Sequence, residues 1–284
     1  AGASYYYQSD IKAFFTKIPT QLIVDRVLHE TNDADLTDLF AKGLEVNLAN
    51  KNELMTYARI FPSGGIGVAQ GSSLSAFAGN VLLYDLDHKL NELGVTAVRY
   101  IDDLVILSDD EDKLNKAIAY AKKELKKFDF SLYEPSPGSD KASAGSCSNS
   151  FKFLGCTLQP NRCVPSKQSR DKLCSEINKA ISISKNSITE YLSGQKRMDI
   201  NSSRSSLLHS IGKKVYGWEK SFSFCTSAHE FAMLDARIVK VISGYENWIH
   251  RKTKNTPPEI LMAVLGVPST KFLFEIDQAK IKKS

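Results

Sequence analysis

Residues 95–107 read VTAVRYIDDLVIL, and this stretch decides the fold of the first half of the chain. Two short apolar runs flank a polar centre, which is the pattern of two partly buried strands in a β-hairpin. No Asn-Gly turn marks the reversal, so the hairpin is inferred from the pattern of residue types alone. The polar centre, Arg99 to Asp103, is therefore expected where the two strands meet.

Asp102 and Asp103 are adjacent carboxylates in this apolar surrounding. Two neighbouring negative charges repel each other and lose hydration on burial, so a compensating group is expected. A divalent ion serves this purpose, and oxygen ligands favour Mg²⁺ or Mn²⁺. Asp10 ends another β-prone segment and supplies a third carboxylate; carboxylates that bridge two ions support phosphoryl and nucleotidyl transfer. On these residues alone, the alternative is a polar turn with two solvated aspartates.

The composition of the whole chain is that of an ordinary globular protein, with 284 residues, 42% hydrophobic and 24% charged. No apolar run reaches the roughly 18–20 residues of a membrane span, and residues 1–8 lack the pattern of a secretory signal. Five cysteines without a C-x-x-C pair argue against a disulfide framework or a structural zinc site. We therefore expect a reducing compartment and a cytoplasmic protein.

Charge divides the chain into two parts of opposite sign. Residues 1–165 carry a net charge of −4, and residues 166–284 carry +9. A carboxylate-rich part followed by a basic part suits a metal site joined to a polyanion-binding surface. Two solvated faces of opposite sign would give the same balance.

Hydrophobic periodicity predicts a mixed α/β region followed by a helical one, with the boundary near Pro165. We accordingly divide the chain into domains 1–165 and 166–284. The elements expected in the first domain are two helices over 20–48 that break at 33–35, a helix over 73–93 closed by Gly94, a helix over 112–128, a mobile loop over 135–150 and a hairpin over 151–164 that turns at Pro160-Asn161. In the second domain, helix breaks are expected near Gly194, Thr226 and Pro257.

Four motifs, taken in order, resemble those of a reverse transcriptase palm. They are Asp10-Ile11-Lys12-Ala13-Phe14-Phe15, Gln70-Gly71-Ser72-Ser73-Leu74-Ser75 with Asn80, Tyr100-Ile101-Asp102-Asp103, and Phe153-Leu154-Gly155. The resemblance implies an α+β fold: a polymerase palm, with an antiparallel sheet backed by helices, followed by an all-α thumb bundle. It also implies an RNA-directed DNA polymerase, a nucleotidyltransferase whose partners are an RNA template, a DNA or RNA primer and dNTPs.

The resemblance assigns the chemistry to a few side chains. Asp10, Asp102 and Asp103, together with the Ile11 carbonyl, would bind two Mg²⁺ ions, for which Mn²⁺ can substitute. Lys141 falls where relatives carry a lysine that could protonate the pyrophosphate; the alternative is an ordinary surface lysine.

The resemblance also assigns contacts to substrate and nucleic acid. Phe15 falls at the position of an aromatic gate against a 2′-hydroxyl, although Phe14 and Phe15 also suit a core. Gln70, Gly71 and Ser72 would lie beside the template and the incoming nucleotide; Ser72 and Ser75 equally suit helix caps. The remaining expected contacts are a primer grip at Phe153, Leu154 and Gly155, and backbone phosphates at Lys213, Lys214 and Lys220. Trp218 and Trp248 fit core anchors better than base-stacking platforms.

The second half points to a subgroup. Ile211-Gly212-Lys213-Lys214-Val215-Tyr216-Gly217-Trp218 is similar to the thumb helix of bacterial group II intron-like reverse transcriptases, a set that includes maturases and retron, diversity-generating and phage-defence enzymes. Ala69 and Ala76 stand where many relatives have proline, which argues against a standard intron maturase. We therefore expect a defence, retron or mobile-element enzyme.

The first motif begins after only nine residues, whereas relatives carry a fingers region before it. We therefore expect a partial chain, with a noncoding RNA or a second chain that supplies the fingers as a further partner. Two other functions stay open. The same fold could serve as a nucleic-acid-binding assembly or splicing factor, or it could carry out protein-primed or template-independent DNA synthesis, with a hydroxyl from Tyr5, Tyr6 or Tyr7 as primer.

Overall fold

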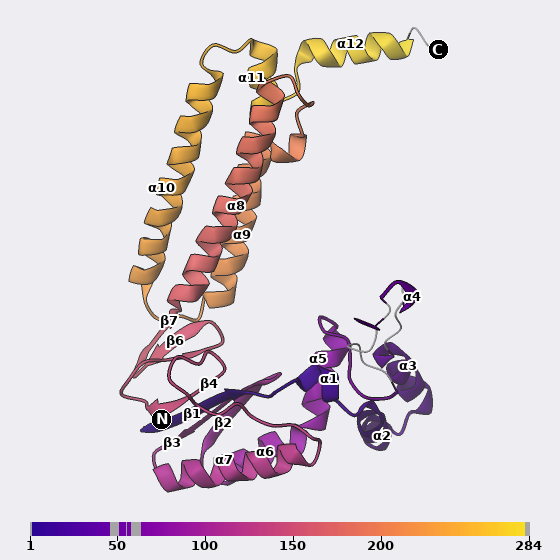
Figure 1. The fold of residues 1–284 in the computed structure, drawn as a ribbon, viewed down its shortest axis with the longest axis vertical. Coiled ribbons are helices and arrows are strands. Elements are labelled where there is room, and N and C mark those ends of the chain that lie inside the picture. The colour runs from indigo at the N-terminus through magenta and orange to yellow at the C-terminus, as the bar shows by residue number, and fades with distance from the viewer. Residues whose placement is uncertain (1, 46–50, 55, 58–63, 282–284) are drawn as a thin grey trace. The chain divides into compact units, whose positions relative to one another are not determined.

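The computed structural model describes residues 2–45, 51–54, 56–57 and 64–281 (Figure 1). The chain forms two compact units, Ala1–Leu154 and Gly155–Ser284. This division comes eleven residues before the boundary predicted at residue 165. Hydrogen bonds explain the difference, because the Ser166 N–H donates to the Gly155 carbonyl at 2.8 Å and the Thr226 N–H donates to the Cys163 carbonyl at 2.8 Å. These bonds tie residues 155–165 to the helices that follow.

The first unit is built on a four-stranded antiparallel sheet in the order β2-β3-β1-β4. Its strands are β1 (Tyr5–Asp10), β2 (Thr96–Tyr100), β3 (Asp103–Ser108) and β4 (Ala142–Ser146). The helices α6 (Tyr84–Glu92) and α7 (Glu111–Lys126) run along one face of this sheet (Figure 1). Tyr7, Leu104 and Ile106 share that face and lie in one buried core with apolar residues of both helices. The predicted antiparallel sheet backed by helices is confirmed.

Strand β4 replaces part of the loop that was predicted over residues 135–150. Its sequence, Ala-Ser-Ala-Gly-Ser, has little intrinsic strand preference, and pairing with β1 supplies its hydrogen bonds. Gly145 lies beside the ring of Tyr6, where an added Cβ would make an ordinary contact at 3.5 Å. The Tyr6 ring in turn stacks on Phe151 of β5 (Phe151–Phe153), with ring centroids 4.0 Å apart.

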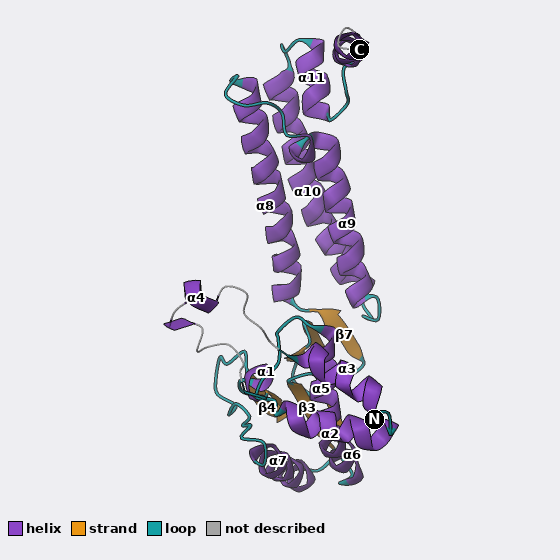
Figure 2. Cartoon of the chain, turned by 90° about the vertical axis from the view of Figure 1, so that its right-hand side faces the viewer, coloured by secondary structure: helices purple, strands orange, loops and turns teal. Residues whose placement is uncertain are grey.

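The helices between β1 and α6 are α1 (Phe14–Lys17), α2 (Thr20–Thr31), α3 (Ala34–Leu44), α4 (Lys51–Leu54) and α5 (Ser73–Leu82). Of these, α2, α3 and α5 pack on one another (Figure 2). The break predicted at 33–35 is confirmed, because Asn32 is left-handed and the Asp33 carboxylate caps α3 by accepting from the Leu36 N–H at 2.9 Å. Residues 46–48 of that prediction lie outside the described residues.

The helix predicted over 73–93 is two helices, α5 and α6, which meet at Leu83. Leu83 has φ −100° and ψ 11°, outside the helical region, and its side chain is buried. Packing explains the bend: α5 lays Gly79 against Phe14, where an added Cβ would come within 2.6 Å of the ring, while α6 packs on β2. The end predicted at Gly94 is confirmed, with φ at +76°.

The second unit is a β-hairpin followed by a helical bundle. The strands β6 (Cys156–Gln159) and β7 (Arg162–Pro165) turn at Pro160-Asn161, as predicted. The helical elements are α8 (Lys167–Leu192), the 3₁₀ turn η2 (Ile200–Ser202), α9 (Arg204–Phe222), α10 (Ala228–Thr253), α11 (Pro258–Leu265) and α12 (Thr270–Ile281). The breaks predicted near Gly194, Thr226 and Pro257 are confirmed. No helix among the described residues is both long enough and apolar enough to cross a membrane.

Candidate active site

The register of the strands places four residues of the sequence motifs and the predicted site in one row across the sheet. Asp10 on β1 lies directly opposite Asp103 on β3, and Asp103 lies opposite Tyr100 on β2. The Asp10 N–H donates to the Lys141 carbonyl at 2.9 Å, which continues the β1–β4 register by one residue. Residues directly opposite each other point to the same face of a sheet. Tyr100, Asp103, Asp10 and Lys141 therefore share the face opposite α6 and α7.

Asp102 occupies the two-residue turn that joins β2 to β3. Its partner in the turn, Ile101, adopts a left-handed backbone with φ +60°, which is costly for a β-branched residue. The Asp102 carbonyl accepts a hydrogen bond from the Ile11 N–H at 2.8 Å. The turn is thereby held beside the residue that follows Asp10, so segments about ninety residues apart bring the three predicted aspartates into one region.

Arg99 is the residue that the sequence interpretation missed. Its side chain is only 1% exposed and lies on the helix-covered face of β2. The guanidinium donates to Asp87 of α6 at 2.9 Å and to the Ile101 carbonyl at 2.7 Å, and it reaches Asn80 of α5 at 3.2 Å. Arg99 therefore holds the left-handed turn that presents Asp102. Its position in the apolar alternation of residues 95–107 could have revealed an inward-facing arginine.

Burial and neighbouring carboxylates together perturb the protonation of Asp103 in this row. Burial, a hydrogen bond with Asp10 and the charges of Asp10 and Asp102 together raise the pKa of Asp103 to about 7. Lys141 forms an ion pair with Asp10, which raises the pKa of the lysine. One ammonium group does not offset the carboxylates of Asp10, Asp103 and the neighbouring turn residue Asp102, so this region suits a further cation.

Phe14 and Phe15 were both candidates for a core residue or an aromatic gate, and they differ in burial. Phe14 is 2% exposed and packs on Phe130, with ring centroids 5.2 Å apart, so it is a core residue. Phe15 is half-buried, and its carbonyl accepts from the Val68 N–H at 2.8 Å. Phe15 stays the candidate for the sugar gate.

The second motif forms the exposed turn before α5 and the start of that helix. Gln70 and Gly71 are exposed, and Gly71 has φ +90° with open space around it. Ser72 occupies the N-cap position, but its side chain makes no capping hydrogen bond. Ser75 is buried in the first turn. The cap interpretation of the serines is therefore not supported by a side-chain bond.

The predicted primer-grip residues form a tight turn after β5. Phe153 is buried, whereas Leu154 is exposed and left-handed, with φ +47°. Gly155 follows with φ +74°, and an added Cβ would lie 2.9 Å from the Ser169 hydroxyl oxygen. Only glycine meets both demands without strain.

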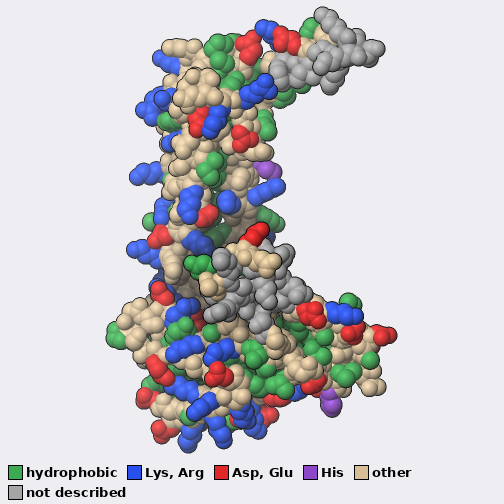
Figure 3. Space-filling view, turned by 45° about the vertical axis from the view of Figure 1, so that its right-hand side comes forward, with side chains coloured by type: hydrophobic (Ala, Val, Ile, Leu, Met, Phe, Trp, Pro, Cys, Tyr) green, Lys and Arg blue, Asp and Glu red, His purple; other side chains and the backbone are tan. Residues whose placement is uncertain are grey.

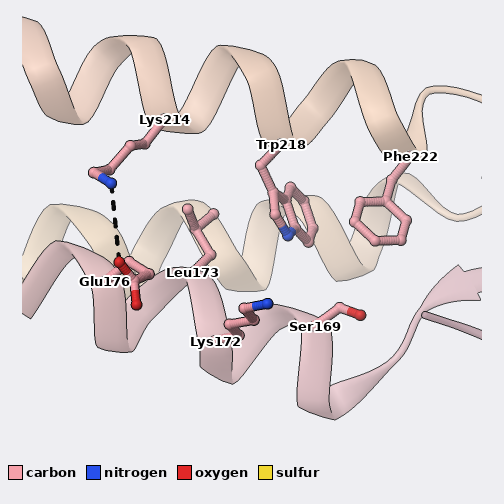
Figure 4. Close-up of a pocket in the computed structure, with 7 residues that line it drawn as sticks. All are labelled: Ser169, Lys172, Leu173, Glu176, Lys214, Trp218 and Phe222. Carbon is pink, nitrogen blue, oxygen red and sulfur yellow. Dashed lines mark ion pairs between the residues drawn. The ribbon is translucent and has the colours of Figure 1, made fainter. Parts of the chain in front are cut away.

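Basic side chains are spread along the helices of the second unit (Figure 3). Among the predicted phosphate contacts, Lys213 is exposed and Lys214 lies 4.0 Å from a carboxylate oxygen of Glu176 across the α8–α9 groove (Figure 4). Lys220 lies 3.5 Å from Glu219 and over the ring of Tyr216. Lys214 and Lys220 thus each lie close to the carboxylate of a glutamate.

The two tryptophans pack within the bundle. In the same groove, Trp218 lies beside Phe222 with ring centroids 4.7 Å apart, above Leu173 of α8 (Figure 4). Trp248 packs against the core near Tyr245. Both positions agree with core anchors.

Comparison with protein-family models decides the family. The model described as "Reverse transcriptase (RNA-dependent DNA polymerase)" matches residues 1–158. The chain belongs to the reverse transcriptase family. The matched region contains all four motifs and all four residues of the row, Tyr100, Asp103, Asp10 and Lys141.

Solved structures similar to this reverse transcriptase chain include two telomerases. Apo telomerase from Candida tropicalis, truncated from the C-terminal domain, shows 15% identity over 56% of this chain and 34% of that chain, with a TM-score of 0.37. Telomerase from Candida albicans, in complex with a TWJ fragment of telomeric RNA, shows 14% identity over 92% of this chain and 46% of that one, with a TM-score of 0.38. The chain thus spans less than half the length of either telomerase chain. A search of curated proteins finds no match.

Reverse transcriptases use divalent metal ions, and the donor set of this chain fits them. Asp10, Asp102 and Asp103 offer hard carboxylate oxygens, and burial together with the neighbouring carboxylates raises the pKa of Asp103. In the part of the chain that the structure describes, the carboxylate oxygens of these three residues do not all come within 4.8 Å of one another. The Lys141 ammonium group pairs with Asp10, and a bound metal ion could take its place beside this carboxylate.

Replacing Asp103 with asparagine is expected to stabilise this reverse transcriptase chain in the absence of divalent ions. The folded-state pKa of about 7 lies above the ordinary aspartate value of 3.8, so the folded state binds this proton more tightly than the unfolded state. The stabilising contribution of the proton is complete below about pH 4 and is lost as pH rises to about 7. A neutral amide avoids the charge, so Asp103→Asn should raise Tm by roughly 2–4 °C at pH 8, a figure discounted for solvent screening, and by less at pH 5.

The measurement is thermal unfolding in a chelator at both pH values. A variant that is equally destabilised at pH 5 and pH 8 would contradict the electrostatic origin of the shift. Asp109→Asn, an exposed site beyond the other end of β3, is the matched control and should show no such pH dependence.

Proposed function

We propose that this chain is an RNA-directed DNA polymerase that adds dNTPs to a primer 3′-hydroxyl. The observation that carries the proposal is the row in which Asp10 lies opposite Asp103, beside the turn residue Asp102, inside the family's matched region. Asp10, Asp102 and Asp103, with the Ile11 carbonyl, are the proposed ligands of two Mg²⁺ ions, for which Mn²⁺ can substitute. Such ions lower the pKa of an attacking hydroxyl and stabilise the charge on a leaving pyrophosphate.

The other residues of the row act around the carboxylates. Lys141 keeps Asp10 partly neutralised before an ion binds, and the same ammonium is the proposed proton donor to pyrophosphate. Tyr100 is 58% exposed on the same face and is available to a primer end. Gln70 and Gly71, exposed before α5, are the proposed neighbours of the template and the incoming base. The Phe153-Leu154-Gly155 turn is the proposed primer grip.

The test is primer extension with the full chain in Mg²⁺. RNA and DNA templates are offered with dNTPs or NTPs. Incorporation of dNTPs that follows the RNA template supports the proposal. Untemplated products support template-independent synthesis instead, and the absence of any product with intact RNA binding supports an assembly or splicing factor, whose motivating feature is the basic second unit.

Protein priming receives no support from the tyrosines at the start of β1. Tyr6 and Tyr7 are 7% and 2% exposed, and the Tyr7 hydroxyl donates to the Tyr133 carbonyl at 3.2 Å. Tyr5 packs against the core. Packing accounts for all three side chains. DNA covalently attached to the protein would overturn this interpretation.

The biological setting that we propose is a bacterial defence system, a retron or a mobile element. This part rests on the similarity of residues 211–218 to a group II intron-like thumb helix; they lie in α9, in the helical bundle. The RNA that copurifies with the chain, sequenced from its native host, would distinguish these settings. A noncoding RNA encoded beside the gene would favour a retron.

Phe15→Val is expected to relax the selection against ribonucleotides. A half-buried ring beneath the sugar leaves no room for a 2′-hydroxyl, and a smaller side chain admits it. The ratio of NTP to dNTP incorporation should rise about tenfold or more. The control is Phe128→Val, which removes an equally half-buried ring from the same core and should leave the ratio unchanged. An unchanged ratio in a folded Phe15→Val protein would exclude the gate.

A further inference from the structure

Three cysteines from three separate segments of the second unit meet at one point. Cys156 lies on β6, Cys163 on β7 and Cys225 in the loop between α9 and α10. The Cys225 sulfur lies 4.0 Å from that of Cys156 and 3.9 Å from that of Cys163. All three sulfurs lie within 4.8 Å of one another. Their sequence spacing forms no recognised metal-binding motif, which is why the sequence argued against a zinc site.

Backbone structure, rather than chance side-chain orientation, holds the thiols together. Leu158 pairs with Cys163 in the hairpin, so Cys156 and Cys163 are diagonal neighbours on one face of the β6–β7 pair. The loop that carries Cys225 is fixed to the same strand by Thr226. Its N–H donates to the Cys163 carbonyl at 2.8 Å, and its hydroxyl accepts from the Cys163 N–H at 3.0 Å.

The spacing of the sulfurs matches a thiolate metal site. A Zn–S bond of about 2.3 Å in tetrahedral geometry separates two sulfurs by about 3.8 Å. Two of the three separations here are 3.9 and 4.0 Å. Sets of thiolate ligands select soft ions such as Zn²⁺ and Cu⁺ over Mg²⁺ or Ca²⁺. Cys156 is buried, whereas Cys163 and Cys225 are half-buried, so an ion has access from solvent.

We propose that Cys156, Cys163 and Cys225 bind one Zn²⁺ ion, which fastens the β6–β7 hairpin to the α9–α10 loop. Binding releases three thiol protons to solvent and forms three Zn–S bonds. Among the described residues, the cluster contains no further His, Asp or Glu ligand, so a water molecule completes the coordination. The site is structural: it fixes the start of the helical bundle and takes no part in nucleotidyl transfer.

A disulfide fits the same cluster less well. A disulfide would join only two of the three sulfurs and requires them to approach to about 2.05 Å.

The experiment measures metal in the full chain, purified with a phosphine reductant and without chelators. Zinc is quantified per chain by mass spectrometry, and the zinc is then replaced with Co²⁺ to record the thiolate-to-cobalt charge-transfer band. We expect one zinc ion per chain and an intense band. Cys225→Ser should weaken zinc binding by about 100-fold or more and remove most of the band. Cys147→Ser, which changes a cysteine of the first unit, should leave both unchanged.

Several results would overturn the proposal. These are a chain that takes up no zinc when zinc is added, a band that is identical in wild type and Cys225→Ser, or a mass two hydrogens lighter that reports a disulfide without metal. If Cys225→Ser fails to fold, Cys163→Ser and the Tm of wild-type protein with and without zinc give the same decision. None of these measurements depends on polymerase activity, so failure of the site and failure of the proposed function are distinguishable.

Discussion

Asp10→Asn is expected to reduce template-directed dNTP incorporation by about 10³-fold or more. Asp10 is central to the row of residues across the sheet, because it lies opposite Asp103 and forms the ion pair with Lys141. Replacing its carboxylate by an amide removes a proposed metal ligand, and a loss of about 4 kcal/mol of transition-state stabilisation corresponds to that factor. Single-turnover primer extension at saturating dNTP measures the effect.

Two comparisons make this result specific. Asp109→Asn changes an exposed aspartate just beyond the other end of β3 and should retain wild-type incorporation. Affinity for a primer–template duplex should change little in Asp10→Asn, because a carboxylate does not bind phosphate. If Asp10→Asn extended a primer within threefold of wild type, Asp10 would not be a metal ligand in the reaction.

Arg99→Met is expected to impair both stability and incorporation, although the buried Arg99 side chain lies on the face of the sheet opposite Asp10 and Asp103. The substitution leaves the Asp87 carboxylate and the Ile101 carbonyl without the guanidinium that now satisfies them. Breaking one side of a largely buried pair costs about 3 kcal/mol, at the lower end of the usual range because Asp87 is 35% exposed. In a chain of this size, that loss lowers Tm by roughly 6–12 °C.

The loss of activity should exceed the loss of folded protein. The left-handed Ile101 no longer has its carbonyl held, so Asp102 loses its fixed position. Below the Tm of the variant, incorporation should fall by at least about tenfold at saturating substrate. Arg26→Met is the matched control, since Arg26 forms an exposed pair with Asp85, and it should leave both measurements near wild type. Full activity in folded Arg99→Met would rule out a positioning role.

The sequence was most informative where local pattern and burial agree. The hairpin over 95–107, the helix beginning near residue 112 and the Pro160-Asn161 turn all carry strong alternation or strong turn residues, and the structure contains each of them. The resemblance of the ordered motifs implied that Asp10 and Asp103 lie close together, and the structure pairs them across two strands. The hairpin, the helix and the turn depend instead on contacts that each segment encodes by itself.

Features that depend on distant partners were missed. Strand β4 is a run of small residues with little strand preference, and pairing with β1 supplies its hydrogen bonds. The bend at Leu83 follows from packing on Phe14 and β2, not from any helix breaker in the sequence. The cysteine cluster brings together positions up to 69 residues apart, through a hairpin and a loop whose contact no local pattern encodes.

The position of β1 inside its sheet has a consequence for synthesis on the ribosome. Residues 5–10 leave the ribosome first among the four strands, yet both neighbours, β3 and β4, are translated more than ninety residues later. At a translation rate of roughly 5–20 residues per second, about 5–20 s pass before β3 is synthesised, and β1 has neither of its strand partners during that time. During that interval its aromatic side chains and open edges are an obvious target for chaperones that bind nascent chains.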